Sequence, residues 1–196
     1  MEKLLIPADT HELIEQAKSG DTAAFRQLFE QYKQPIFNFI ARMIGHHHDA
    51  EDILQEVFVK IYWNLSALRD AQAFKGWLFS AARNEAINYL RKYRRRRLDS
   101  LEKYNEDKME LPAVSDDSRH TNPEHETVDA ELQEAVRQAL NEVPEAYRAA
   151  FVLGVLEGYS YKEVGKILGC SVTNVKSRVF RARTVMSEKL RPYFQT

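Results

Sequence analysis

The 196-residue sequence predicts an all-α protein of two small helical domains joined by a flexible acidic linker. Apolar residues recur every three or four positions on both sides of the middle of the chain, and no segment alternates as a strand would. A polar, acidic stretch interrupts the helical pattern between them. We therefore expect the first domain over residues 10–97, the linker over residues 98–128 and the second domain over residues 129–193.

Capping and turn residues indicate the first three helices. Thr10 is suited to cap a short first helix that stops near Gly20, and Asp21 is suited to cap a second one. Pro35 is well placed near the start of a third helix, because its fixed φ suits the first turn. Gly45 should end that helix, since glycine readily adopts a left-handed terminus.

Two more helices complete the first domain. Asp49 is suited to cap the fourth, in which apolar residues recur at helical spacing as far as Leu65. After a break over residues 66–72, a long fifth helix is expected from about Phe74 to Arg96. The pattern then dissolves, and residues 107–125 carry two prolines with several Ser, Asp and Glu, which is typical of a linker.

The second domain contains a helix that starts at Pro144 and then a helix-turn-helix. Ser160 and Glu163 form a capping box, Gly169 provides a left-handed turn, and Ser171 can cap the next helix. Such a helix suits the DNA major groove, because Arg, Lys and Asn bind base edges and Ser or Thr bind phosphates. A helical hairpin with a solvated basic face is the alternative. The polar and basic residues of this helix are Thr173, Asn174, Lys176, Ser177, Arg178, Arg181 and Arg183.

The charge distribution supports a nucleic-acid partner more than the net charge of −1 does. Residues 91–97 hold six basic residues and no acidic one, and residues 136–196 have a net charge of +5. Residues 98–135, with 3 basic and 12 acidic residues, separate the two basic regions. A phosphate backbone responds to these local charges and not to the total.

Composition argues against several other classes of protein. No apolar run approaches the roughly 20 residues of a membrane span, and the N-terminus is too polar for a secretory signal. Cys170 is the single cysteine, so an internal disulfide is excluded and a cytoplasmic protein is expected. Cys170 lies in the predicted turn between the two helices, where a small buried residue is the simplest role.

The predicted fourth helix has a strongly acidic outer face. The residues that crowd it are Asp49, Glu51, Asp52, Gln55 and Glu56. Like charges at this spacing repel by a few tenths of a kcal/mol per pair, so the cluster does not serve helix stability. A solvated acidic face and a docking surface for a basic partner helix both remain open.

The segment from Phe74 mixes aromatic, amide and basic side chains. Unpaired bases stack on aromatic rings while cations bind phosphates, so this mixture suits opened DNA. An aromatic stripe at helical spacing is more often part of a core, however. We assign Trp77, Leu78 and Ala81 mainly to the core, and we assign to the surface the residues Asn84, Asn88, Arg91 and Lys92.

The tract His46-His47-His48 invites a metal-binding interpretation. Three adjacent histidines cannot all face one ion on a helix, and no Cys cluster supports the site. We expect an exposed loop here, with no metal and no other cofactor.

These motifs together resemble the extracytoplasmic-function (ECF, group IV) sigma factors of bacterial RNA polymerase, within the sigma-70 family. Residues 49–58 match D-A-E-D-x-x-Q-E-x-F, and residues 74–84 match F-x-x-W-L-x-x-x-A-x-N. Residues 161–183 match the family's helix-turn-helix, with Gly165 in place of the usual alanine, and residues 143–148 resemble its L-P-E-x-x-R entrance. Asn88 stands where the family often has aspartate.

The resemblance implies a sigma2-like bundle and a sigma4-like helix-turn-helix domain. The acidic helix would dock on the clamp helices of the polymerase's largest subunit through Asp49, Glu51, Asp52, Gln55 and Glu56. A loop over residues 66–73 would hold a base flipped from the promoter's −10 strand. The residues implied at the −10 element are Ser66, Leu68, Arg69, Asp70, Phe74, Asn84, Asn88, Arg91 and Lys92.

The resemblance also implies the −35 contacts and the partners. The −35 element would be read by Ser171, Thr173, Asn174, Lys176, Ser177, Arg178, Arg181 and Arg183. The linker would run toward the RNA exit channel. The implied partners are core RNA polymerase, promoter DNA and an anti-sigma factor, with no small-molecule substrate.

Two other classes of function fit the sequence less well. A stand-alone helix-turn-helix regulator would need a dimer interface or ligand pocket in the first domain, and the sequence shows neither. A magnesium-dependent nucleic-acid enzyme would need a second set of carboxylates and a nucleophile or base, which are absent from the pattern. DNA binding by the isolated protein distinguishes a stand-alone regulator from a sigma factor, since a repressor binds its duplex site tightly without polymerase.

Overall fold

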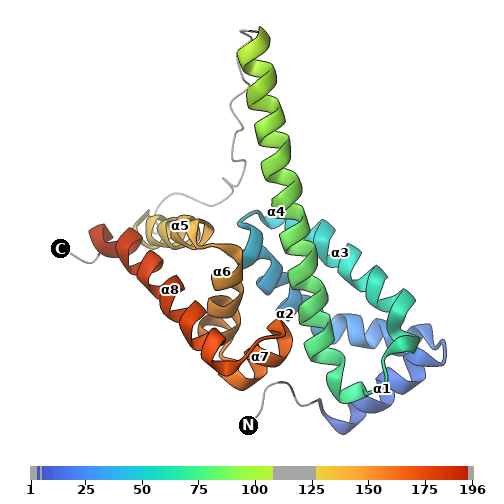
Figure 1. Ribbon diagram of the computed structural model, residues 1–196. Helices are drawn as coiled ribbons and strands as arrows, with labels where there is room; N and C mark the ends of the chain where they lie inside the picture. Colours follow the sequence, from blue (N-terminus) through green and yellow to red (C-terminus); the bar gives the residue numbers. More distant parts are fainter. Residues whose placement is uncertain (1–3, 5, 108–126, 194–196) are drawn as a thin grey trace.

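The computed structural model describes residues 4, 6–107 and 127–193, and every regular element within them is helical (Figure 1). The first group comprises α1 (Ala8–Lys18), α2 (Thr22–Ile44), α3 (His47–Asn64), the 3-10 turns η1 (Leu65–Ala67) and η2 (Ala71–Ala73), and α4 (Phe74–Asp107). The second group comprises α5 (Thr127–Glu142), α6 (Glu145–Phe151), the π-helical turn η3 (Val152–Leu156), α7 (Tyr161–Leu168), α8 (Val172–Leu190) and the 3-10 turn η4 (Arg191–Tyr193). The predicted all-α class with two helical domains is therefore confirmed.

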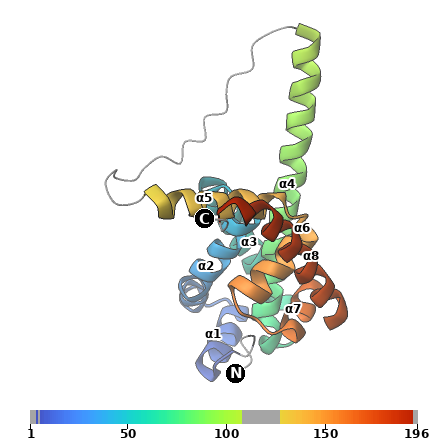
Figure 2. The same ribbon diagram turned by 90° about the vertical axis from the view of Figure 1, so that its left-hand side faces the viewer.

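The second group packs against both α2 and α4. Within the first group, α2 and α3 pack against α4, and α1 packs against α2. From the second group, α5, α6 and η3 contact α2, and α7 contacts α4 (Figure 1). The C-terminal half of α4 projects beyond the body of the molecule in both views (Figure 2). The basic residues after position 90 lie where α4 leaves the body.

The second and third predicted helices are one helix, α2, with Pro35 inside it. Proline has no N–H to donate to the preceding turn, so the sequence favoured a break there. Packing outweighs this cost, because a single buried stripe runs past Pro35 from Leu28 to Ile40. The predicted ends of α2 are confirmed: Asp21 accepts from the N–H groups of Ala23 and Ala24, and Gly45 is left-handed with a φ of 78°.

The predicted starts of the first and fourth helices are wrong by three residues each, since the observed caps are Pro7 and His46. Helix α1 begins after Pro7, and Thr10 lies inside it, 1 % exposed, with its hydroxyl within hydrogen-bonding distance of Gln31. Helix α3 begins at His47, so Asp49 lies in its first turn, where a carboxylate interacts favourably with the helix dipole. In both cases a polar side chain that suits a cap is used inside the first turn.

Helix α4 is longer than the sequence predicted. It continues to Asp107 instead of ending near Arg96, so its last residues occupy part of the predicted linker. Residues 108–126 of that linker lie outside the described residues. In the second group, α6 starts after Pro144 as expected, but its continuation to residue 156 is π-helical, a feature with no sequence signal.

The buried apolar residues of both groups form one continuous cluster. Phe79 of α4 meets Tyr159 edge-on, with ring centroids 5.3 Å apart. Beside this contact, the Ser80 hydroxyl donates to the carbonyl of Ile167 at 2.8 Å. The two domains are thus packed closely together in this structure, a feature that periodicity along the chain could not predict.

Arg148 crosses the same boundary. It is 3 % exposed, and its guanidinium donates to the carbonyls of Val143, Asn141 and Met43, the last of which belongs to α2. Burial, with a contribution from Arg94, lowers the pKa of Arg148 to about 10, so the side chain stays charged at neutral pH. This network satisfies a buried charge with backbone acceptors.

Candidate polymerase and nucleic-acid interfaces

The predicted helix-turn-helix is formed by α7 and α8. The capping box at the start of α7 is present, with the Ser160 side chain accepting from the Glu163 N–H and the Glu163 carboxylate accepting from the Ser160 N–H. Gly169 is left-handed with a φ of 62°, and the Ser171 side chain accepts from the N–H of Asn174 at the start of α8. The capping and turn residues in the sequence were therefore sufficient to predict this motif.

Gly165 allows the turn between these helices to close tightly. A Cβ at this position would lie 2.7 Å from the backbone carbonyl oxygen of Cys170. The Cys170 N–H also donates to the Gly165 carbonyl at 3.0 Å. The departure from the family's usual alanine therefore coincides with a close approach of backbone to backbone, and Cys170 is half-buried in this turn.

The outer face of α8 is exposed, as predicted. Arg178 is half-buried, and the exposed predicted residues are Ser171, Thr173, Asn174, Lys176, Ser177, Arg181 and Arg183. Arg181 donates to the Tyr147 hydroxyl at 2.7 Å and lies over its ring. Val175 and Val179 face inward, whereas Val172, the first residue of α8, is 40 % exposed.

Phe180 is a candidate contact that the sequence reasoning missed. Its side chain is 71 % exposed in the middle of α8, among the basic residues. A phenylalanine this exposed is uncommon in a core-facing pattern. The sequence carried no signal for its exposure, because an apolar residue beside Val179 suits a core equally well.

The acidic face of α3 is confirmed as a surface. Glu51, Asp52, Gln55 and Glu56 are all exposed. Lys60, the nearest base along the helix, pairs with Glu85 of α4 at 2.8 Å. The acidic face therefore keeps its negative charge.

Asp49 differs from the other acidic residues of α3. It is half-buried and accepts a hydrogen bond from the Tyr89 hydroxyl of α4 at 2.6 Å. Burial and this hydrogen bond raise the pKa of Tyr89, so Tyr89 remains a donor. Asp49 joins α3 to α4 and contributes less to the exposed face than predicted.

The segment between α3 and α4 exposes part of the predicted −10 site. Ser66, Arg69 and Asp70 are exposed, and Asp70 accepts from the Gln72 N–H at 2.9 Å, which shapes the start of η2. Leu68 is half-buried and packs against the core. The break expected between the two helices is present, and its two ends form the 3-10 turns η1 and η2.

Phe74 requires a correction. The resemblance placed it among the −10 residues, but it is 0 % exposed and packs edge-on against Tyr32 and Trp77. An aromatic residue at a helix start can belong to either a core or a stacking surface, and only the resemblance favoured the latter. Its position beneath the turn makes it a support for that segment and not a contact.

The exposed face of α4 continues the predicted −10 surface. Asn84, Asn88, Arg91 and Lys92 are all exposed and recur at intervals of three or four residues along one side of the helix. Trp77 is half-buried, Leu78 is fully buried and Ala81 is half-buried, in agreement with their predicted places in the core.

The histidine tract forms the start of α3 and not a loop. His47 lies in the first turn, with its ring edge-on to Phe37 at 4.7 Å, and His46 lies near Tyr93. Within residues 6–107 and 127–193, no three His, Cys, Asp or Glu side chains are grouped so that they could hold a metal ion. Aromatic packing accounts for His46 and His47.

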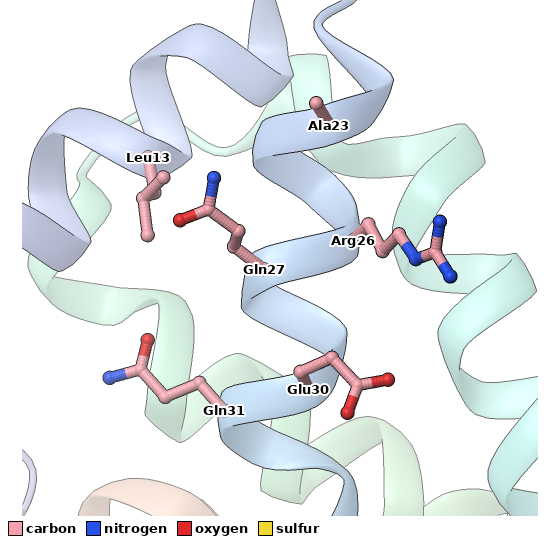
Figure 3. A pocket seen from close by; sticks show the side chains of 6 residues that line it. All are labelled: Leu13, Ala23, Arg26, Gln27, Glu30 and Gln31. Carbon is pink, nitrogen blue, oxygen red and sulfur yellow. The ribbon is translucent and has the colours of Figure 1, made fainter.

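A shallow pocket is lined by residues of α1 and α2 (Figure 3). It is lined by Leu13, Ala23, Arg26, Gln27, Glu30 and Gln31. None of these residues belongs to a predicted site. Among the described helices, none combines the length and apolarity that a membrane crossing demands.

Two family models match the chain in the order of its two helical groups. Residues 28–96 match "Sigma-70 region 2", and residues 133–186 match "Sigma-70, region 4". The first range contains the acidic face of α3 and the exposed face of α4. The second contains the helix-turn-helix.

Similar proteins cover nearly the whole chain. The ECF RNA polymerase sigma-E factor of Haemophilus influenzae is 34 % identical over 185 residues, covering 92 % of this chain and 94 % of that protein. The sigma-E factor of Escherichia coli K12 is 35 % identical, covering 92 % of this chain and 93 % of its own.

Two solved structures share the fold. The sigma factor RpoE from Bartonella quintana, in complex with the anti-sigma factor NepR, has a TM-score of 0.62 and 26 % identity, over 85 % of this chain and 96 % of that chain. CnrH, in complex with the cytosolic domain of CnrY, has a TM-score of 0.66 and 25 % identity, over 93 % of this chain and 97 % of that chain.

Proposed function

This chain belongs to the ECF family of RNA polymerase sigma factors, and on that premise we propose how its surfaces divide the work of promoter recognition. It is an alternative sigma factor that binds core RNA polymerase and directs transcription initiation. The observation that supports the division best is an exposed acidic face on α3 and an exposed basic face on α8 in one molecule.

The acidic face of α3 docks on core polymerase. Glu51, Asp52, Gln55 and Glu56 are exposed, and Lys60 is held by Glu85, so a basic helix of the polymerase would meet little like charge. Complementary charge speeds association and fixes the orientation of a partner. Asp49 acts indirectly, through its hydrogen bond with Tyr89.

The exposed surface from Ser66 to Lys92 receives the −10 element. Arg69 and the basic residues of α4 neutralise phosphates, and Asn84 and Asn88 offer amides to the edges of unpaired bases. The buried Phe74 and Leu78 give this surface a rigid base. Residues 10–97 serve as the unit that docks and opens the promoter.

Helix α8 reads the −35 element in the major groove. Its N-terminal residues Thr173, Asn174 and Lys176 are exposed as base readout requires, and Arg183 lies farther along for phosphate. Phe180 offers an apolar contact suited to a thymine methyl group. Residues 129–193 serve as this second unit, with residues 98–128 between them.

Regulation by an anti-sigma factor fits the same fold. The two solved relatives are complexes, one with the anti-sigma factor NepR and one with the cytosolic domain of CnrY. We expect a comparable protein to bind this chain in the cytoplasm, where the polymerase acts. The chain itself is not an enzyme, since sigma factors as a family supply recognition while the polymerase performs catalysis.

Charge reversal on α3 tests the docking proposal. Replacing Asp52→Lys and Glu56→Lys together should abolish co-elution with core polymerase while leaving the helical circular dichroism spectrum unchanged, because both side chains are exposed. The matched control is Glu12→Lys with Glu15→Lys on α1, which makes the same charge change on another exposed helix. Unchanged co-elution of the α3 variant would overturn the docking assignment.

A further inference from the structure

The acidic face of α3 continues into an apolar patch. Asp52, Glu56, Val59 and Trp63 are separated by four, three and four residues, so they form one stripe along the helix. This stripe lies opposite the buried residues Ile53, Val57 and Ile61. Val59 is 54 % and Trp63 75 % exposed. An isolated exposed apolar residue is ordinary, but an exposed Trp in line with a docking surface is not.

Trp63 is supported by a packed aromatic cluster between α2 and α3. Its ring meets Tyr62 edge-on with centroids 5.6 Å apart, and Tyr62 meets Phe25 of α2 at 4.9 Å. Phe25 in turn contacts Phe58, which is 4 % exposed. The Trp63 side chain has only two rotatable torsions and is packed against Tyr62 on one side. It therefore loses little conformational entropy when a partner covers it. Such residues commonly dominate the energy of an interface.

The charges around the stripe identify the kind of partner. On the outer face of α3, Val59 and Trp63 follow Asp52 and Glu56, while Lys60 is paired with Glu85. Negative charge along the same stripe disfavours a nucleic-acid phosphate and also a second copy of this chain. A basic amphipathic helix complements this stripe. Its basic residues match Asp52 and Glu56, and an apolar residue farther along matches Val59 and Trp63.

We propose that α3 carries a two-part docking surface for core polymerase, in which Asp52 and Glu56 steer a basic helix and Val59 and Trp63 anchor its apolar end. This inference rests on the proposed docking role of α3. The acidic half sets the rate and orientation of association. The apolar half slows dissociation, because burying the indole excludes water from the contact.

The test is the affinity of full-length variants for core polymerase. Trp63→Ala should raise the Kd for core at least about tenfold, mostly through faster dissociation, and Val59→Ala should raise it less. Tyr193→Ala is the matched control, since Tyr193 is 50 % exposed at the opposite end of the chain and should leave the Kd unchanged. Circular dichroism establishes that each variant is folded.

A second measurement follows Trp63 directly. Trp77→Phe leaves Trp63 as the single tryptophan, which can be replaced by 5-hydroxytryptophan and excited selectively in the presence of core polymerase. Acrylamide quenching of this probe should fall when core is added, because the exposed ring becomes covered. Quenching that does not change with core would overturn the proposal.

The remaining outcomes separate the alternatives. If Asp52→Lys with Glu56→Lys abolishes core binding but Trp63→Ala does not change it, the acidic docking site stands and the apolar anchor is wrong. If Trp63→Ala keeps core affinity but weakens holoenzyme binding to a partly single-stranded promoter, the ring stacks on a base instead. If it changes only sedimentation of the free protein, the patch contacts a second copy.

Discussion

Glu163 shows how one side chain can serve local and long-range structure together. Its carboxylate caps α7 through the Ser160 N–H at 2.7 Å and accepts from the Leu4 N–H at 2.6 Å. The side chain is 2 % exposed, so burial by itself would raise the pKa of Glu163. The hydrogen bonds from Ser160 and Leu4 outweigh burial and hold the pKa below its usual value of 4.5.

This lowered pKa predicts an acid-sensitive contribution to stability. A carboxyl group with a lower pKa in the folded state stabilises the fold fully above its unfolded pKa and loses this contribution as the pH falls through the folded value. Glu163→Gln should lower the free energy of unfolding at pH 7 by about 1 kcal/mol and flatten its decline below pH 5. Thermal unfolding from pH 3 to 7 measures both effects. An equally steep decline in the variant would contradict this role.

Residue-scale signals in the sequence were reliable where the chemistry is local. Asp21, Ser160 and Ser171 cap helices as predicted, because a cap needs only its own next few N–H groups. Thr10 and Phe74 were misplaced, because their roles depend on Gln31 and Tyr32, which lie in another helix. Spacing along the chain does not identify such partners.

At the scale of the element, one face of α8 packs against its own domain and the opposite face is exposed for binding DNA. Val175 and Val179 hold it against the rest of the second domain, and its outer face exposes the polar residues with Phe180. The basic composition was visible in the sequence. The direction of Phe180 was not, because an apolar residue next to Val179 suits the core equally well in a pattern.

Phe180→Ala should impair −35 recognition without affecting docking. Loss of an apolar contact to a thymine methyl, worth about 1 kcal/mol, should reduce run-off transcription about fivefold at promoters that need a −35 element. The Kd for core polymerase should stay unchanged, since Phe180 lies far along the chain from α3. Equal transcription by variant and unmodified protein would show that Phe180 does not contact DNA. Glu188→Ala, exposed on the same helix, is the control.

The sequence predicted correctly which segments are helical, but it predicted the lengths of these helices less well. Pro35 suggested two helices where one buried stripe makes a single α2, and α4 extends eleven residues past its predicted end at Arg96. Both errors underestimate helix length, because packing and continuity outweigh unfavourable single residues. The acidic face of α3, in contrast, was identified correctly since it depends on periodicity alone.

At the scale of the whole molecule, the close packing of the two domains is the main feature that the sequence did not predict. Arg148 binds the Met43 carbonyl, and Ser80 binds the Ile167 carbonyl across the boundary. The −10 and −35 elements lie about 25 base pairs apart, which is roughly 85 Å of duplex at 3.4 Å per pair. Domains in direct contact cannot reach both elements at once.

If α4 and α8 bind these two elements as proposed, the domains separate when the protein binds polymerase. Fluorophores on Glu12→Cys and Glu188→Cys, with Cys170→Ser to remove the native thiol, report the distance between the two groups of helices. Energy transfer should be high in the free protein and fall on addition of core polymerase. Constant transfer in a complex that transcribes would show that the closed arrangement is also the working one.

Run-off transcription from a genomic-fragment library, with core RNA polymerase alone and with this protein added, tests the central claim most directly. The surfaces on α3, α4 and α8 predict new discrete start sites that share one −35 and one −10 element, and these should disappear with the Asp52→Lys and Glu56→Lys variant. No new start sites, together with tight duplex binding by the protein alone, would contradict a sigma factor that works through polymerase.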